Sequence, residues 1–70
     1  MENVVISIKS EKLFTDVLDK IDELGGDVVE TRYDLLWKRY EIHVNLTPRQ
    51  SDSLRSFIKN RNTDIMDFET

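Results

Sequence analysis

The chain of 70 residues has no cysteine and no alanine, one proline, two glycines, one histidine and one tryptophan. Without cysteine it can form neither a disulfide framework nor a thiolate metal site. No apolar run approaches the roughly 20 residues of a membrane-spanning helix. So short a chain buries only about 60% of the surface that its unfolded form exposes. We expect one domain over residues 1–70, stabilised by packing and helix capping, with no cofactor.

Met1 leads directly into a strand-like segment with no signal peptide before it, which favours a cytoplasmic protein. The absence of alanine, together with many Asp, Asn, Ile and Lys residues, suggests an AT-rich genome. A small phage or mobile-element protein that docks on a host factor is one interpretation of this composition.

Charge is unevenly distributed along the chain. The formal net charge of −4 argues against general affinity for nucleic acid, which normally requires a basic surface. Residues 11–24 sum to −3 and residues 48–61 to +3. The basic side chains of the second segment could meet phosphates or the acidic first segment, although a solvated helix face is the commonest interpretation. This secondary basic patch consists of Arg49, Arg55, Lys59 and Arg61.

Two helices are predicted from apolar spacing and capping residues. The stripe of apolar residues between 13 and 24 has helical periodicity, with Ser10 as N-cap and Gly25 as the left-handed stop. Thr47, Pro48 and Gln50 have the pattern of a capping box with proline at the first helical position. They predict a second helix that ends near residue 60.

Period-two alternation predicts four strands, at residues 3–9, 27–33, 36–46 and 64–68. The third strand is the longest, and it places Tyr40, Ile42, Val44 and Leu46 on one face. Its outward residues are then Trp37, Arg39, Glu41, His43 and Asn45. In the last strand, Met66 and Phe68 are the expected inward pair.

A two-residue turn at Asp34 and Leu35 is expected to join the second and third strands. This turn pairs core-facing residues with one another, namely Tyr33 with Leu36, Thr31 with Lys38, and Val29 with Tyr40. On the outer face it pairs Glu30 with Arg39 and Arg32 with Trp37.

The element order, strand–helix–strand–strand–helix–strand, predicts an α+β fold, the ferredoxin-like βαββαβ two-layer sandwich. Its antiparallel sheet has the order 4-1-3-2, with both helices on one face. The charged residues of the second and fourth strands suit edge positions. The expected core consists of Val4, Ile6, Ile8, Phe14, Val17, Leu18, Ile21, Ile42, Val44, Leu54 and Phe57.

Three segments resemble ACT-like regulatory modules: Val-Val-Ile-Ser-Ile at 4–8, the helix exit at 22–26, and Asp-Val-Val at 27–29. The effector loop of amino-acid-binding ACT domains, close to Asp-x-Pro-Gly, is absent. The resemblance therefore implies a regulatory fold without an amino-acid ligand.

The candidate binding residues are Trp37, Arg32, Arg39 and His43, because an exposed tryptophan beside arginines can form a stacking platform. Trp37 could instead shield the hairpin backbone or mediate self-association. A lone histidine with no paired base or nucleophile is usually a solvated sheet residue.

No catalytic residue, glycine-rich phosphate loop or metal-ligand spacing is found in the sequence. We expect a non-enzymatic regulatory or interaction module that binds a protein partner, or a second copy, through its open sheet face. The alternative is a nucleic-acid-binding module that uses the open sheet or the basic second helix. Neither a membrane nor a small-molecule ligand is expected.

Overall fold

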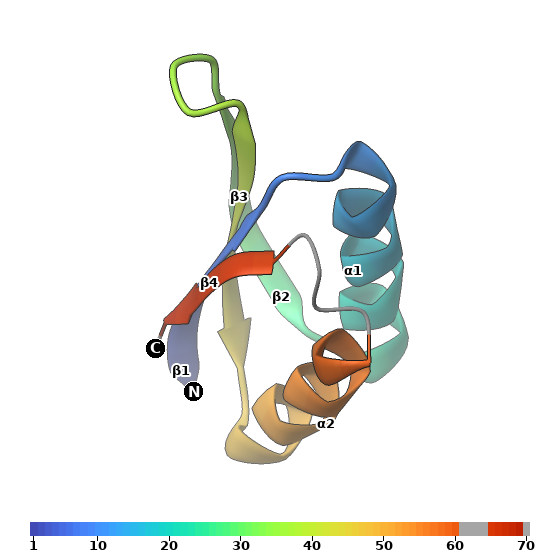
Figure 1. Ribbon diagram of the computed structural model, residues 1–70. Coiled ribbons are helices and arrows are strands. Elements are labelled where there is room, and N and C mark those ends of the chain that lie inside the picture. Colours follow the sequence, from blue (N-terminus) through green and yellow to red (C-terminus); the bar gives the residue numbers. More distant parts are fainter. Residues whose placement is uncertain (61–64, 70) are drawn as a thin grey trace.

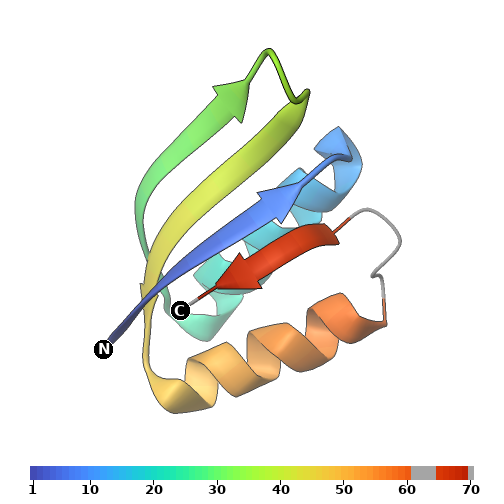
Figure 2. The same cartoon turned by 60° about the vertical axis from the view of Figure 1, so that its left-hand side comes forward.

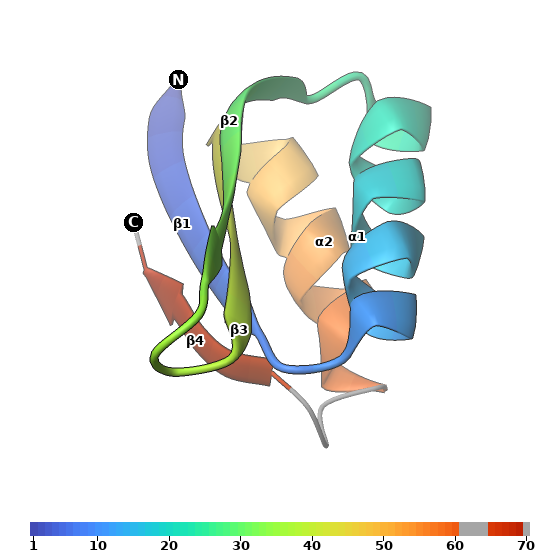
Figure 3. The same ribbon diagram turned by 90° about the horizontal axis from the view of Figure 1, so that it is seen from above.

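The computed structural model describes residues 1–60 and 65–69, the latter as backbone. Its elements follow the order β1 (Glu2–Ile8), α1 (Glu11–Leu24), β2 (Asp27–Asp34), β3 (Arg39–Leu46), α2 (Pro48–Lys59) and β4 (Ile65–Glu69). The strands form an antiparallel sheet in the order β2-β3-β1-β4. Both helices cover one face of this sheet (Figures 1 and 3). The predicted α+β class is confirmed.

The central pair of strands, β1 and β3, supplies most of the sheet's core surface. Val4 lies opposite Val44, and Ile6 lies opposite Ile42. All four side chains have 0% exposure. Figure 2 shows these two strands in the middle of the sheet, in front of the helices. The alternating pattern of the sequence thus identifies the buried face of both strands correctly.

The helices complete the core with residues spaced about one turn apart. Eight of the expected core residues are buried, and Leu13, Leu46 and Ile58 join them. Phe14, Leu18 and Phe57 were expected there but are only partly buried against the core. The Phe14 ring packs against the edge of this core and stacks on Tyr40 of β3, with ring centroids 4.6 Å apart.

Helix α1 begins and ends as predicted. The Leu13 amide donates to Ser10 Oγ at 3.2 Å, which satisfies one of the free amides of the first turn. At the other end, Gly25 has φ 79°. The Gly25 amide donates to the Asp22 carbonyl at 3.1 Å, and the Gly26 amide donates to the Ile21 carbonyl at 2.9 Å. These two bonds form a Schellman motif.

The capping box of α2 also connects the two helices. The Gln50 amide donates to Thr47 Oγ1 at 3.2 Å, and the Thr47 amide donates to Gln50 Oε1 at 2.9 Å. The other end of the same side-chain amide, Gln50 Nε2, donates to the Leu24 carbonyl at 2.9 Å. Because Leu24 is the last residue of α1, its carbonyl has no acceptor role within its own helix. One glutamine therefore satisfies the start of α2 and the end of α1.

The predicted β2–β3 turn is wrong. The turn occupies four residues, Leu35–Lys38, and the register pairs Asp34 with Arg39 and Tyr33 with Tyr40. The physical reason is Asp34, whose Oδ1 accepts from the Leu36 amide at 2.9 Å and the Trp37 amide at 3.1 Å. Residues 36–38 therefore belong to the turn and not to the strand.

Most residues of β2 that were predicted to face the core side do so in the observed register as well. The register differs from the predicted one by an even number of residues, so Thr31 still faces the core side, opposite Ile42. A bulge between Val28 and Glu30 exchanges the faces farther back, so that Val28, instead of Val29, lies opposite an inward residue, Val44. The expectation for Met66 and Phe68 lies outside the described side chains.

We predict that Ile42→Asp unfolds the domain, because an unpaired carboxylate in the core between the sheet and helices is not tolerated. Circular dichroism and thermal denaturation measure the effect. Asn45→Asp, on the other face of the same strand, should remain folded. A cooperatively folded Ile42→Asp variant would contradict the assignment of the buried face.

We predict that Thr47→Ala lowers the free energy of unfolding by about 1 kcal/mol, the typical value of an N-cap. Gln50→Ala should cost at least as much, because it also removes the bond to the Leu24 carbonyl. Urea denaturation gives both values. The matched control is Ser53→Ala at an exposed α2 position, which should stay within about 0.5 kcal/mol of the wild type. A Gln50→Ala variant as stable as this control would show that the hydrogen bond from Gln50 to the Leu24 carbonyl does not stabilise the fold.

Candidate functional site

Three consecutive large apolar side chains lie exposed in the turn between β2 and β3. We call Leu35, Leu36 and Trp37 the apolar turn. Their exposed fractions are 81%, 82% and 62%. Figure 1 shows that this turn projects beyond the rest of the fold, at the end of the β2–β3 hairpin. Single exposed apolar residues are common on protein surfaces, but a contiguous group of this kind is less common, and it makes the apolar turn the candidate site.

The apolar turn is stabilised by hydrogen bonds from its own backbone to Asp34. The Asp34 carboxylate accepts from two successive backbone amides of the turn, those of Leu36 and Trp37. Lys38 closes the turn with φ 51°, a left-handed conformation that is uncommon for a residue other than glycine. These hydrogen bonds favour the turn conformation of the structure over other backbone conformations.

Basic residues predominate around the apolar turn. Segments 9–12 and 32–41, which meet at this end of the sheet, carry five basic and three acidic side chains in a molecule of net charge −4. Of the acidic residues, Asp34 is engaged with the turn and Glu41 with Arg39. The turn is thus an apolar patch with a locally basic border.

The open face of the sheet carries a row of paired charges instead of an aromatic platform. Glu30 Oε1 lies 3.1 Å from Arg32 Nε on β2. On β3, Glu41 Oε2 lies 3.3 Å from Arg39 Nη2, and Glu41 Oε1 lies 3.3 Å from His43 Nε2. The buried Nε of Arg39 has no hydrogen-bond partner among the described residues.

The structure brings together three of the four predicted binding residues. Arg32, Arg39 and His43 share the open face, whereas Trp37 lies in the turn, because β3 begins only at Arg39. The predicted pairs of Arg32 with Trp37 and of Glu30 with Arg39 are wrong. Arg32 lies opposite Glu41, and Glu30 lies opposite His43. Sequence reasoning missed Leu35 and Leu36; the signal available was Asp34, a residue that commonly begins turns.

The predicted basic patch is divided along α2. Arg49, Arg55 and Lys59 are exposed, and Arg61 lies outside the described residues. Arg55 and Lys59 are four residues apart and share a side of the helix, but Arg49 is six residues before Arg55 and lies on another side. The described part of this patch is therefore not a single stripe.

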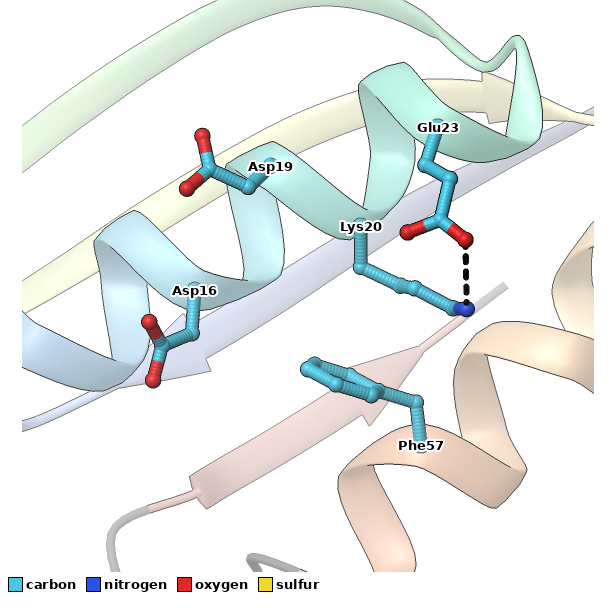
Figure 4. Close-up of a pocket in the computed structure, with 5 residues that line it drawn as sticks. All are labelled: Asp16, Asp19, Lys20, Glu23 and Phe57. Atoms are coloured by element: carbon cyan, nitrogen blue, oxygen red, sulfur yellow. Dashed lines mark hydrogen bonds and ion pairs between the residues drawn. The ribbon is translucent and has the colours of Figure 1, made fainter.

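A shallow hollow of about 220 Å³ lies between the helices, lined by Asp16, Asp19, Lys20, Glu23 and Phe57. Lys20 Nζ lies 3.4 Å from Glu23 Oε1 and 5.6 Å from the centroid of the Phe57 ring. Figure 4 shows the carboxylates of Asp16 and Asp19 pointing away from Lys20. The contact of Lys20 with Phe57 joins the two helices. We therefore interpret the hollow as a packing contact between helices, with acidic side chains at its solvent-exposed border.

Within residues 1–60 and the described backbone of β4, no cluster of three or more His, Asp or Glu residues could hold a metal ion. In the same part of the chain, neither helix has the length and apolar character needed to cross a membrane. No protein-family model, curated protein or solved structure matches the chain.

The Glu30–Arg32 contact predicts a dependence on pH. The hydrogen bond from Arg32 holds the pKa of the Glu30 carboxyl below its ordinary value. A carboxyl with a lowered folded-state pKa contributes stability above its unfolded pKa, and this contribution is lost as the pH falls through the folded pKa. We predict that Arg32→Gln raises the pKa of Glu30, measured by NMR titration of its side-chain carboxyl, and reduces the loss of stability in acid.

Arg49→Gln, on α2, removes the same charge at a distance and is the control for this titration. High salt should reduce the difference between the two variants, because both partners are largely exposed. An unchanged Glu30 titration in Arg32→Gln would contradict the assignment.

Proposed function

We propose that the chain is a small, non-enzymatic interaction module of ferredoxin-like fold that docks on a protein partner through its apolar turn. The strand order β2-β3-β1-β4, with helices between the parallel-running strands, supports the ferredoxin-like assignment. A regulatory role, exerted by occupying a site on the partner, is part of the same proposal.

The proposal rests on the exposure of Leu35, Leu36 and Trp37 in a turn whose backbone amides are hydrogen-bonded to Asp34. Moving a large apolar side chain from water into a pocket contributes roughly 1.5–3 kcal/mol. Because the hydrogen bonds to Asp34 favour this turn conformation, we expect binding to lose less conformational entropy than it would for a loop without them. Tryptophan is also among the residues that most often dominate binding energy at interfaces.

The border of the turn indicates the chemistry of the partner. Lys38 and Arg39 follow the turn directly, and Lys9 lies at the same end of the sheet, since Ile8 pairs with Tyr40. Charges of this sign are complemented by acidic groups and have little effect on an apolar contact itself. We therefore expect a protein with an apolar groove bordered by Asp and Glu.

Binding of nucleic acid by the open face receives less support. Arg32 and Arg39 each lie beside a glutamate, so the positive charge of this face is largely compensated within the protein. A phosphate ligand would have to displace these carboxylates. Affinity for oligonucleotides that falls steeply with salt would favour the nucleic-acid alternative.

The test compares Leu36→Asp and Leu36→Met as bait proteins in extracts of the source cells. We predict that Leu36→Asp loses at least about 90% of a captured protein, because a charged side chain cannot enter an apolar groove without a partner. Leu36→Met keeps the apolar surface and should retain capture. Both variants should melt like the wild type, since the side chain is 82% exposed.

Binding by the purified partner then gives the affinity of each variant directly. Equal affinities of the two Leu36 variants for the purified partner would contradict docking through the apolar turn. Vesicles of anionic lipid serve as a second comparison, because an apolar turn with a basic border has features of a membrane-inserting loop. Vesicle binding without capture of a protein would overturn the proposed partner class.

A further inference from the structure

The outer edge of β2 is exposed along nearly its whole length. In the described sheet, β2 pairs with β3 on one side, and its other side lies at the edge of the sheet. Residues 27–33 are all exposed. They include Val29 and Tyr33, with exposed fractions of 58% and 47%. Such an edge presents unpaired backbone groups and can accept another strand.

We propose that the β2 edge pairs with β2 of a second copy, antiparallel and centred on Thr31, to form a symmetric dimer. This interface is separate from the apolar turn and does not depend on the proposed docking function. The evidence is the self-complementary sequence of the strand, Glu30-Thr31-Arg32.

Charge selects this register over its neighbours. If the two copies form one continuous sheet with all helices on one face, directly opposite residues must point to the same face. The two-fold axis must then lie midway between the two copies of one residue, so that this residue is opposite itself. An axis at Glu30 or at Arg32 places two like charges opposite each other. An axis at Thr31 places Glu30 opposite Arg32 of the second copy, and Arg32 opposite Glu30 of the second copy.

The central positions fit the same register. Glu30 and Arg32 lie on the open face, opposite His43 and Glu41 of β3, so the four charges of the dimer would alternate across that face. At the axis, Thr31 would face Thr31 of the second copy, which is a favourable cross-strand pair. Tyr33, whose ring packs on Tyr40 of its own chain with centroids 4.7 Å apart, and the bulged residue Val29 lie outside the regular part of this contact.

The bulge at Val29 limits the length of this contact. The β2–β3 ladder is regular from Glu30 to Asp34 and irregular before Glu30. With the axis at Thr31, the regular pairing is limited to Glu30, Thr31 and Arg32 of each copy. Such a contact is much smaller than the roughly 800 Å² per partner of a standard stable interface. We therefore expect weak, concentration-dependent association. The two apolar turns would lie at opposite ends of the joined sheet, because the paired strands run antiparallel, and the dimer could engage two partner sites.

A single introduced cysteine tests the axis, because the chain has no cysteine of its own. In Thr31→Cys the two thiols would lie on the two-fold axis, with Cβ atoms about 4.5–5.5 Å apart, close to disulfide distance. In Tyr33→Cys, on the same face, the two thiols would be four residues apart along the strands, or about 13 Å. Mild oxidation should give a disulfide dimer at least tenfold faster for Thr31→Cys.

Charge exchange provides the second measurement, by sedimentation of the cysteine-free protein. Glu30→Arg and Arg32→Glu should each weaken self-association roughly tenfold, because like charges then face each other. An equimolar mixture of these two variants should associate at least as well as the wild type. Arg49→Glu, on α2, is the control for a change in net charge and should self-associate like the wild type.

A wild type that stays monomeric at all accessible concentrations would overturn the proposal. Equal oxidation rates of the two cysteine variants, or a mixture that associates no better than its components, would overturn it as well. Association lost in Leu36→Asp but retained in Glu30→Arg would assign self-association to the apolar turn instead.

Discussion

The pairing of β1 with β3 is the interaction on which the rest of the fold depends. It sets Val4 against Val44 and Ile6 against Ile42, and the four side chains form the completely buried surface that the helices cover. Every other element is held by contact with this pair or with a neighbouring strand. In a chain of 70 residues there is little additional core, so individual hydrogen bonds at the ends of elements matter more than in a larger domain.

The hydrogen bond between the two helices is an example of such a contact at the ends of elements. Helices α1 and α2 lie side by side over the same small surface, so the end of one comes close to the start of the other. Gln50 uses both ends of its side-chain amide at this point, one in its own capping box and one on Leu24. A residue type chosen for local capping thus also fixes a long-range contact.

The regions left outside the core are those proposed to bind. The helices cover one face of the central strands, while the β2–β3 hairpin extends beyond the helices (Figure 1). Its turn exposes Leu35, Leu36 and Trp37, and its outer strand exposes Val29 and Tyr33. Among the residues that the structure describes, every exposed large apolar side chain except that of Met1 lies in this hairpin. Packing accounts for part of Tyr33, whose ring contacts Tyr40, but no core contact accounts for Leu35, Leu36 and Trp37 among the described residues.

Local signals in the sequence predict most of the architecture, including the β2–β3 hairpin, but not the turn and register of that hairpin. Ser10, Gly25 and the Thr47–Gln50 box act within three or four residues, so their structures can be read from the sequence directly. Residues 36–46 alternate as a strand would, and nothing in that pattern reveals that the Asp34 carboxylate captures the amides of Leu36 and Trp37. The bulge at Val29 depends on pairing with β3 and has no glycine to indicate it. Both features decide where the candidate surfaces lie.

Docking through the apolar turn can be tested by the accessibility of Trp37, because it is the only tryptophan in the chain. Collisional quenching of its fluorescence by acrylamide can be compared with that of a free tryptophan derivative, first in the isolated protein and then in the complex with its partner. If the apolar turn docks on the partner, quenching should be close to that of the free compound in dilute isolated protein, and Trp37 should be strongly protected in the complex. A Trp37 that is already protected in the isolated monomer, or that remains fully accessible in the complex, would contradict docking through the apolar turn.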